Sequence, residues 1–111
     1  MERNNIVFRV ANGEEKIEHS NKFDRIIANL VLMATENPQK MMSNLHDLSS
    51  ENCLLGVTVW GNQEHSNLLT IMTEAMKANN MEIPNERSHS HLFNKLDELA
   101  EETGWKIVTQ W

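Results

Sequence analysis

The amino-acid sequence predicts an α+β fold with an N-terminal β-hairpin, a mixed sheet of about four strands, and four helices packed mainly over one face of that sheet. Three observations lead to this prediction: a hairpin turn near the N-terminus, a continuous apolar run in the middle of the chain, and helix-type spacing of apolar residues in between. The chain has 111 residues, of which 40% are hydrophobic and 23% charged, so a single domain over residues 1–111 is expected.

The central strand is expected within residues 53–62, which read Cys-Leu-Leu-Gly-Val-Thr-Val-Trp-Gly-Asn. This run is rich in β-branched residues and is apolar almost without a break. A strand of this kind is usually buried on both faces, so we expect it inside the sheet beneath the helices. A helix from about Gln63 to Ala78 should follow it directly.

The N-terminal hairpin is predicted from Asn12-Gly13, because a type I′ turn needs positive φ at both central residues. Residues 6–11 place Ile, Phe and Val alternately on one face, which predicts the first strand. Residues 14–19 would return antiparallel, and their charges are typical of an edge strand.

The first helix is predicted to follow the capping residues Ser20-Asn21 and to extend to Ala34. Its second half is apolar on nearly every side, since Leu32 and Met33 fall outside its main apolar stripe. Such a helix is either central to the monomer or packed against another subunit. We expect a homo-oligomer that assembles through Leu32 and Met33.

Three further segments complete the predicted fold. Asn37-Pro38 is a typical helix start, so a short helix should precede the central strand. The last helix should begin between residues 85 and 90, carry Phe93 on its apolar stripe, and end before a C′ glycine at Gly104. Residues 105–111 are then predicted to form the final strand.

The charge balance and the cysteine count exclude several classes of protein. Lys and Arg total 10 and Asp and Glu total 16, so the net charge of −6 argues against a binder of nucleic-acid duplexes. The single Cys53 rules out an intramolecular disulfide and a cysteine-based zinc site. No run approaches the roughly 20 apolar residues of a membrane span, and no signal peptide is recognisable, so a cytoplasmic location is expected.

The candidate ligand site lies where two predicted helices begin. Helix N-termini present free N–H groups and the positive end of a dipole, which suit a phosphate or carboxylate. One start follows the central strand, and the other spans residues 85–88. An arginine there could make a bidentate contact, and a tryptophan could stack on the ligand. The predicted ligand-binding residues are Trp60, Gly61, Asn62, His65, Arg87, Ser88 and His89.

The histidines raise a metal hypothesis, because His89 and His91 are close in sequence and His65 could supply a third ligand. On a helix, however, residues two apart do not face each other, so this pair converges only in a loop. We therefore predict that the protein needs neither a metal nor a cofactor.

Three functional hypotheses follow from these observations. Small size, acidity and the lack of a catalytic motif favour a stoichiometric binder over an enzyme, which is an argument at the level of protein class. The first hypothesis is a non-enzymatic homo-oligomeric protein that sequesters a small anionic or nucleotide-like ligand, for example as an anti-defence protein of a phage or mobile element. The second is a stoichiometric protein–protein inhibitor with an adaptable, Met-rich surface. The third is a histidine-dependent phosphoesterase.

Overall fold

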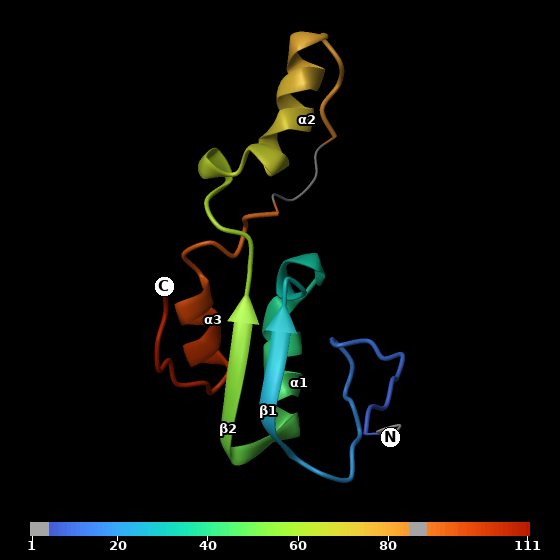
Figure 1. Ribbon diagram of the computed structural model, residues 1–111, viewed down its shortest axis with the longest axis vertical. Coiled ribbons are helices and arrows are strands. Elements are labelled where there is room, and N and C mark those ends of the chain that lie inside the picture. The colour runs from blue at the N-terminus through green and yellow to red at the C-terminus, as the bar shows by residue number, and fades with distance from the viewer. Residues whose placement is uncertain (1–4, 85–88) are drawn as a thin grey trace.

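The computed structural model describes residues 5–84 and 89–111, and a two-stranded parallel sheet lies at its centre (Figure 1). The elements in chain order are β1 (Phe23–Asn29), the 3₁₀ helix η1 (Leu32–Ala34), α1 (Pro38–Leu48), β2 (Ser49–Thr58), the 3₁₀ helix η2 (Gln63–His65), α2 (Asn67–Ala78) and α3 (Leu96–Glu102). The α+β class is consistent with the prediction. The mixed sheet of about four strands and the four helices are wrong, because the described residues form two parallel strands and three α-helices.

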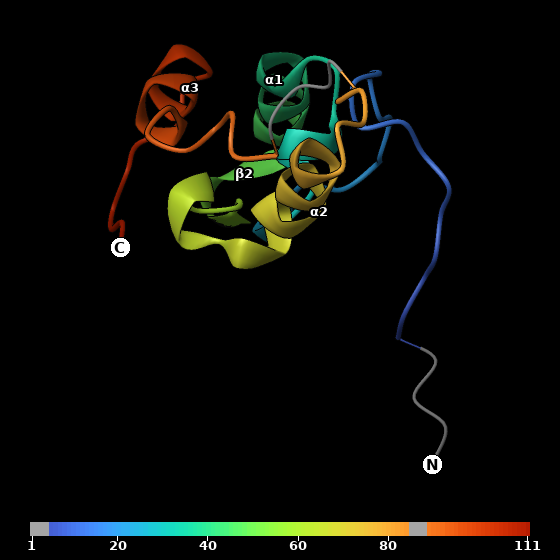
Figure 2. The same cartoon turned by 90° about the horizontal axis from the view of Figure 1, so that it is seen from above.

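The centre of the fold is a β1–α1–β2 crossover. Ile26 lies opposite Leu55 and Ala28 opposite Val57, so the two strands run parallel. Such strands need a helix between them, and α1 covers the far face of the sheet in Figures 1 and 2. The resulting crossover is right-handed, as nearly all such connections are. The predicted start of α1 is confirmed, because the Asn37 side chain accepts a hydrogen bond from the Lys40 N–H and Pro38 opens the helix.

The predicted first helix is wrong, because its first half is the strand β1. Apolar residues such as Ile26 and Ile27 fit a strand equally well, and pairing with β2 decides between the two conformations. The strand ends at Leu30, which has a φ of 51°, and η1 follows. There Leu32 is 0% and Met33 9% exposed, so these two side chains form the monomer core and are not available to a second subunit.

The predicted N-terminal hairpin is also wrong. A turn does form at Asn12-Gly13, where the Glu15 N–H donates to the Asn12 carbonyl over 3.1 Å and the Glu14 N–H donates to Asn12 Oδ1 over 3.0 Å. A type I′ turn needs a positive φ at Gly13, but Gly104 is the one glycine with a positive φ. The flanking segments therefore do not pair. Instead, the Asn44 amide in α1 donates to the carbonyls of Gly13 and Glu15, both over 2.8 Å.

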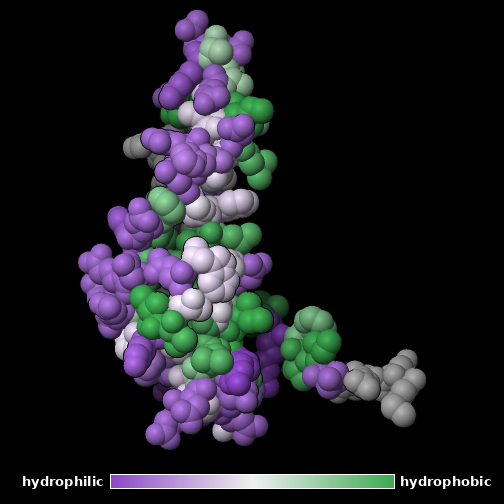
Figure 3. All heavy atoms as spheres, turned by 60° about the vertical axis from the view of Figure 1, so that its left-hand side comes forward, coloured by the Kyte–Doolittle hydropathy of each residue, from purple (hydrophilic) through white to green (hydrophobic). Residues whose placement is uncertain are grey.

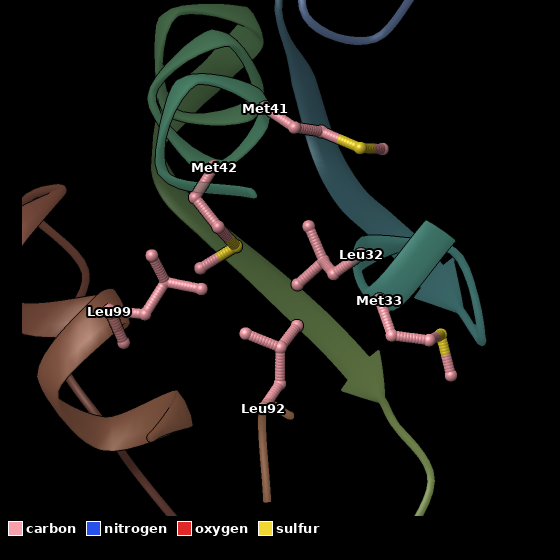
Figure 4. Packing of buried hydrophobic residues seen from close by; sticks show 7 residues of the cluster. Leu32, Met33, Met41, Met42, Leu92 and Leu99 are labelled. Carbon is pink, nitrogen blue, oxygen red and sulfur yellow. The ribbon is translucent and has the colours of Figure 1, made fainter. Parts of the chain in front are cut away.

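The hydrophobic core fills the space between the sheet and the helices α1 and α3. In Figure 4, Met42 of α1 and Leu99 of α3 point toward each other, and Leu32 and Leu92 enter the same space over β2. The buried cluster consists of Leu32, Met33, Met41, Met42, Leu92, Leu99 and Ala100. This core lies on one face of the sheet only.

A strand does form in the predicted central region, but β2 spans Ser49–Thr58 rather than residues 53–62, and the predicted burial on both faces is wrong. Burial alternates along β2, with Leu55 and Val57 packed against the core cluster. On the other face Leu54 is 53% exposed, and Ile27 of β1 is 82% exposed. Both strands face the viewer in Figure 1, and no described helix lies in front of them. The prediction failed because an apolar sequence indicates only that a strand can be buried. It does not indicate that the same chain has helices to pack on both faces of the sheet.

The C-terminal end of α3 follows the prediction for Gly104. This glycine has a φ of 86°, its N–H donates to the Glu101 carbonyl, and the Trp105 N–H donates to the Ala100 carbonyl over 2.9 Å. These two bonds form a Schellman motif. The Trp105 ring then packs back, with Nε1 donating to the Met42 carbonyl over 3.2 Å. The predicted strand at residues 105–111 is wrong, since this segment is extended but pairs with no described strand.

The molecule is unusually open for its size. Its accessible surface is 9264 Å², whereas a compact monomer of 12.8 kDa exposes roughly 6,300 Å². The radius of gyration is 17.4 Å, against about 13 Å for a compact chain of this length. Helix α2 projects beyond the ends of the strands in Figure 1, and hydrophobic side chains reach the surface in several places on the face shown in Figure 3. Among the described residues, no helix has the length and apolar character needed to cross a membrane.

Candidate functional site

The site is built on the connection that leaves β2. The strand ends at Thr58, and four residues later Asn62 caps η2, where its side chain accepts a hydrogen bond from the Glu64 N–H over 2.9 Å. Ser66 Oγ donates to the Asn62 carbonyl over 3.0 Å and closes this turn. The predicted helix from Gln63 is thus divided into η2 and α2, and it ends at Ala78 as predicted.

A hollow of about 440 Å³ opens beside this connection. One side comes from η2 and the first turns of α2, and the other from the turn that precedes α3. Its lining residues are Asn62, Gln63, Glu64, Thr70, Ser90, His91 and Phe93. The hollow falls within the usual range of small-molecule sites, about 300–1,000 Å³. It includes Asn62 of the first predicted helix start, whereas the second, at residues 85–88, lies outside the described residues.

The structure places the individual predicted residues differently around this hollow. Asn62 lines it. His65 and His89 are exposed to solvent and are not among its lining residues, and nothing lies within 4 Å of a Cβ placed on Gly61. Trp60 is half-buried and packs against the hydrophobic core rather than lining the hollow. Arg87 and Ser88 lie outside the described residues.

Sequence reasoning missed most of the lining, and Phe93 shows why. It was predicted on the apolar stripe of a helix starting before residue 90, but α3 begins only at Leu96. Phe93 lies in a preceding turn, where Asn94 has a φ of 61°, and it remains 40% exposed. An asparagine directly after an aromatic residue was the available signal, because Asn tolerates this left-handed conformation. Ser90 Oγ and His91 Nε2 are buried atoms at the same turn.

The chemistry of the hollow is that of hydrogen bonding rather than of positive charge. Its lining residues carry amide, hydroxyl and imidazole groups, and Glu64 contributes a carboxylate, although most of the exposed lining surface is apolar. No group of three His, Cys, Asp or Glu side chains suited to a metal ion occurs in residues 5–84 and 89–111. The arrangement can therefore hold a small ligand that combines hydrogen-bonding groups with an apolar part, and the Phe93 ring offers it an aromatic surface.

A second, larger hollow of about 670 Å³ lies between residues 16–22 and the C-terminal end of α1. Its lysines are already engaged: Lys16 forms an exposed ion pair with Glu18 at 3.9 Å, and Lys22 Nζ donates to the Asp47 carbonyl. The sequence did not single out this region. Its mixed charges offer no preference for an anion.

Comparisons of the chain with protein-family models, with curated proteins and with solved structures give no match.

Proposed function

We propose that this chain is a non-enzymatic cytoplasmic binding protein that acts as a homo-oligomer and holds a small nucleotide-like ligand in the hollow between η2 and residues 90–93. The observation that carries the proposal is the shared lining of that hollow by two segments far apart in sequence. Sequestration requires binding only, so it fits a site that combines hydrogen-bonding groups with one exposed ring.

The nucleotide-like class follows from the side chains in the lining. The Asn62 amide oxygen accepts from the Glu64 N–H, and its NH₂ group is a donor that suits an acceptor on the edge of a nucleobase. Phe93 is partly exposed at the same place, and aromatic rings stack on bases of any kind. The Glu64 carboxylate would repel a phosphate inside the hollow, so the phosphate of the ligand would project toward solvent.

Replacement of Phe93 by alanine should weaken binding of a nucleoside monophosphate, measured by calorimetry, by about tenfold, because stacking on one base is worth about 1–3 kcal/mol. Phe23→Ala is a matched control, since Phe23 is 39% exposed and Phe93 40%. Native mass spectrometry of the purified protein would identify any retained ligand and count the subunits. Equal affinity of the two variants, or no binding by the wild type, would remove the proposed site.

A stoichiometric protein–protein inhibitor is the second candidate, and the exposed face of α2 favours it. Leu68, Ile71 and Met72 follow helical spacing and are each more than 60% exposed. An amphipathic helix of this kind can place its apolar face in a groove of another protein. Ile71→Glu should then abolish inhibition of the target and leave nucleotide binding unchanged, which would separate the two functions.

A further inference from the structure

The sheet of this protein is incomplete as it stands. Parallel sheets normally have both faces covered, whereas this pair of strands packs against helices on one face only. Among the described residues β1 pairs with β2 only, so the opposite edge of β1 carries unpaired backbone groups. The Leu30 N–H donates to the Thr58 carbonyl over 3.0 Å. Because N–H directions alternate along a strand, the N–H groups of Ile27 and Asn29 point to the free edge.

The chain also carries an apolar segment that covers nothing. We call residues 5–10 the arm, and they include Ile6, Val7, Phe8 and Val10, which are 69%, 79%, 90% and 106% exposed. These β-branched and aromatic residues favour a strand. An extended arm of this length spans about 20 Å, close to the roughly 23 Å of β1.

We propose that two copies of the chain exchange their arms, so that the arm of each copy adds as a strand to the free edge of β1 in the other. The proposal rests on the homo-oligomer of the proposed function and names its interface. A reciprocal exchange is closed and symmetric, which is the usual arrangement of a homodimer. Main-chain hydrogen bonds would supply the pairing, as in other cases of strand addition.

The attachment of the arm to the body favours pairing with a second copy rather than with β1 of the same chain. Residues 13–15 are fastened to α1 by the Asn44 amide, and the Glu36 N–H donates to the Glu14 carboxylate over 2.7 Å. From this anchor the arm leaves the body on the side of the sheet that no helix covers (Figure 2). It is thus directed away from its own β1.

The surface area of the molecule matches what such a dimer needs. The chain exposes roughly 3,000 Å² more than a compact monomer of its mass. Obligate homodimers bury about 2,000–5,000 Å² in total. The uncovered surface is thus large enough to supply an interface of this size.

The decisive test is sedimentation velocity of the full chain at micromolar concentration. The wild type should be a dimer, and the double variant Phe8→Glu, Val10→Glu should raise the dissociation constant at least about 100-fold, because two carboxylates would be desolvated in the interface. The matched control is Val108→Glu, Trp111→Glu, whose side chains at the other end of the chain are 80% and 103% exposed. The control should remain a dimer.

A backbone substitution separates strand pairing from general apolar contact. Ile27→Pro removes an N–H at the free edge, where proline is tolerated, and should also prevent dimerisation. Ile27→Val keeps that N–H and should preserve the dimer. In the wild type, hydrogen exchange at the amides of Ile27 and Asn29 should be slow in the dimer and fast on dilution to the monomer. This measurement needs no variant, so it decides the question if the arm variant fails to fold.

The possible failures are distinguishable. A monomeric wild type would overturn both the arm exchange and the homo-oligomer of the proposed function. A wild-type dimer that survives the arm substitutions, or that the control disrupts equally, would overturn the arm exchange alone. Slow exchange at Ile27 and Asn29 in a monomer would show that the arm pairs within its own chain. None of these results affects nucleotide binding, which calorimetry measures independently.

Discussion

A Leu32→Ala variant is expected to lose about 2–5 kcal/mol of unfolding free energy, the usual range for removing a buried leucine side chain. Leu32 has no exposed surface and lies among the methionines and leucines that join η1, α1 and α3. Its loss would leave a cavity at the centre of a small core. The total unfolding free energy of a natural domain is only about 5–15 kcal/mol, so a large fraction of the Leu32→Ala molecules should be unfolded at 37 °C.

Urea denaturation followed by circular dichroism measures this effect, and Ile27→Ala is the matched control. Ile27 is another aliphatic residue near the sheet, but it is 82% exposed, so its truncation should change the stability of the monomer by about 0.5 kcal/mol or less. A Leu32 variant with unchanged stability but impaired assembly would contradict the structure, because it would place Leu32 at a subunit contact.

The second large effect is expected at Gly104. A left-handed conformation costs a residue with a side chain about 1–2 kcal/mol, and Gly104 has a φ of 86°. A Cβ at this position would also lie 3.2 Å from His46 Nε2. Gly104→Ala should therefore reduce the unfolding free energy by about 2 kcal/mol or slightly less.

Two controls identify the cause of that loss in the same denaturation experiment. Gly104→Asn introduces the same Cβ but tolerates the left-handed region, so it should be less destabilising than alanine. Gly61→Ala should be nearly neutral, because nothing lies within 4 Å of a Cβ placed at that position. Equal stability of the Gly104→Ala and Gly61→Ala variants would mean that the Schellman motif does not hold the end of α3.

The parts of the fold that the sequence predicted correctly are those specified by local signals. Asn37-Pro38 determines the start of α1 through one side-chain hydrogen bond and one fixed φ. Gly104 determines the end of α3 in the same local way. The apolar β-branched run identified β2, since few other conformations suit it.

The errors arose where a distant partner decides the structure. Residues 23–29 satisfy both a helical and an alternating pattern, and the choice depends on β2, with Ile26 opposite Leu55. The candidate site shows the same limit. The helix-capping pattern predicted that Asn62 belongs to the site. No local signal showed that the turn carrying Phe93 would line the same hollow.

The direct passage of α1 into β2 at Ser49, with no loop between them, has a consequence for how the chain folds. Residues 23–58 contain both strands, their crossover helix and four of the seven buried cluster residues, namely Leu32, Met33, Met41 and Met42. Contacts close in sequence form with little loss of loop entropy, so this segment is the natural folding nucleus. Helix α3 would dock onto it later. Helix α2 makes few contacts with the rest of the chain and should open and close as a separate, less stable unit.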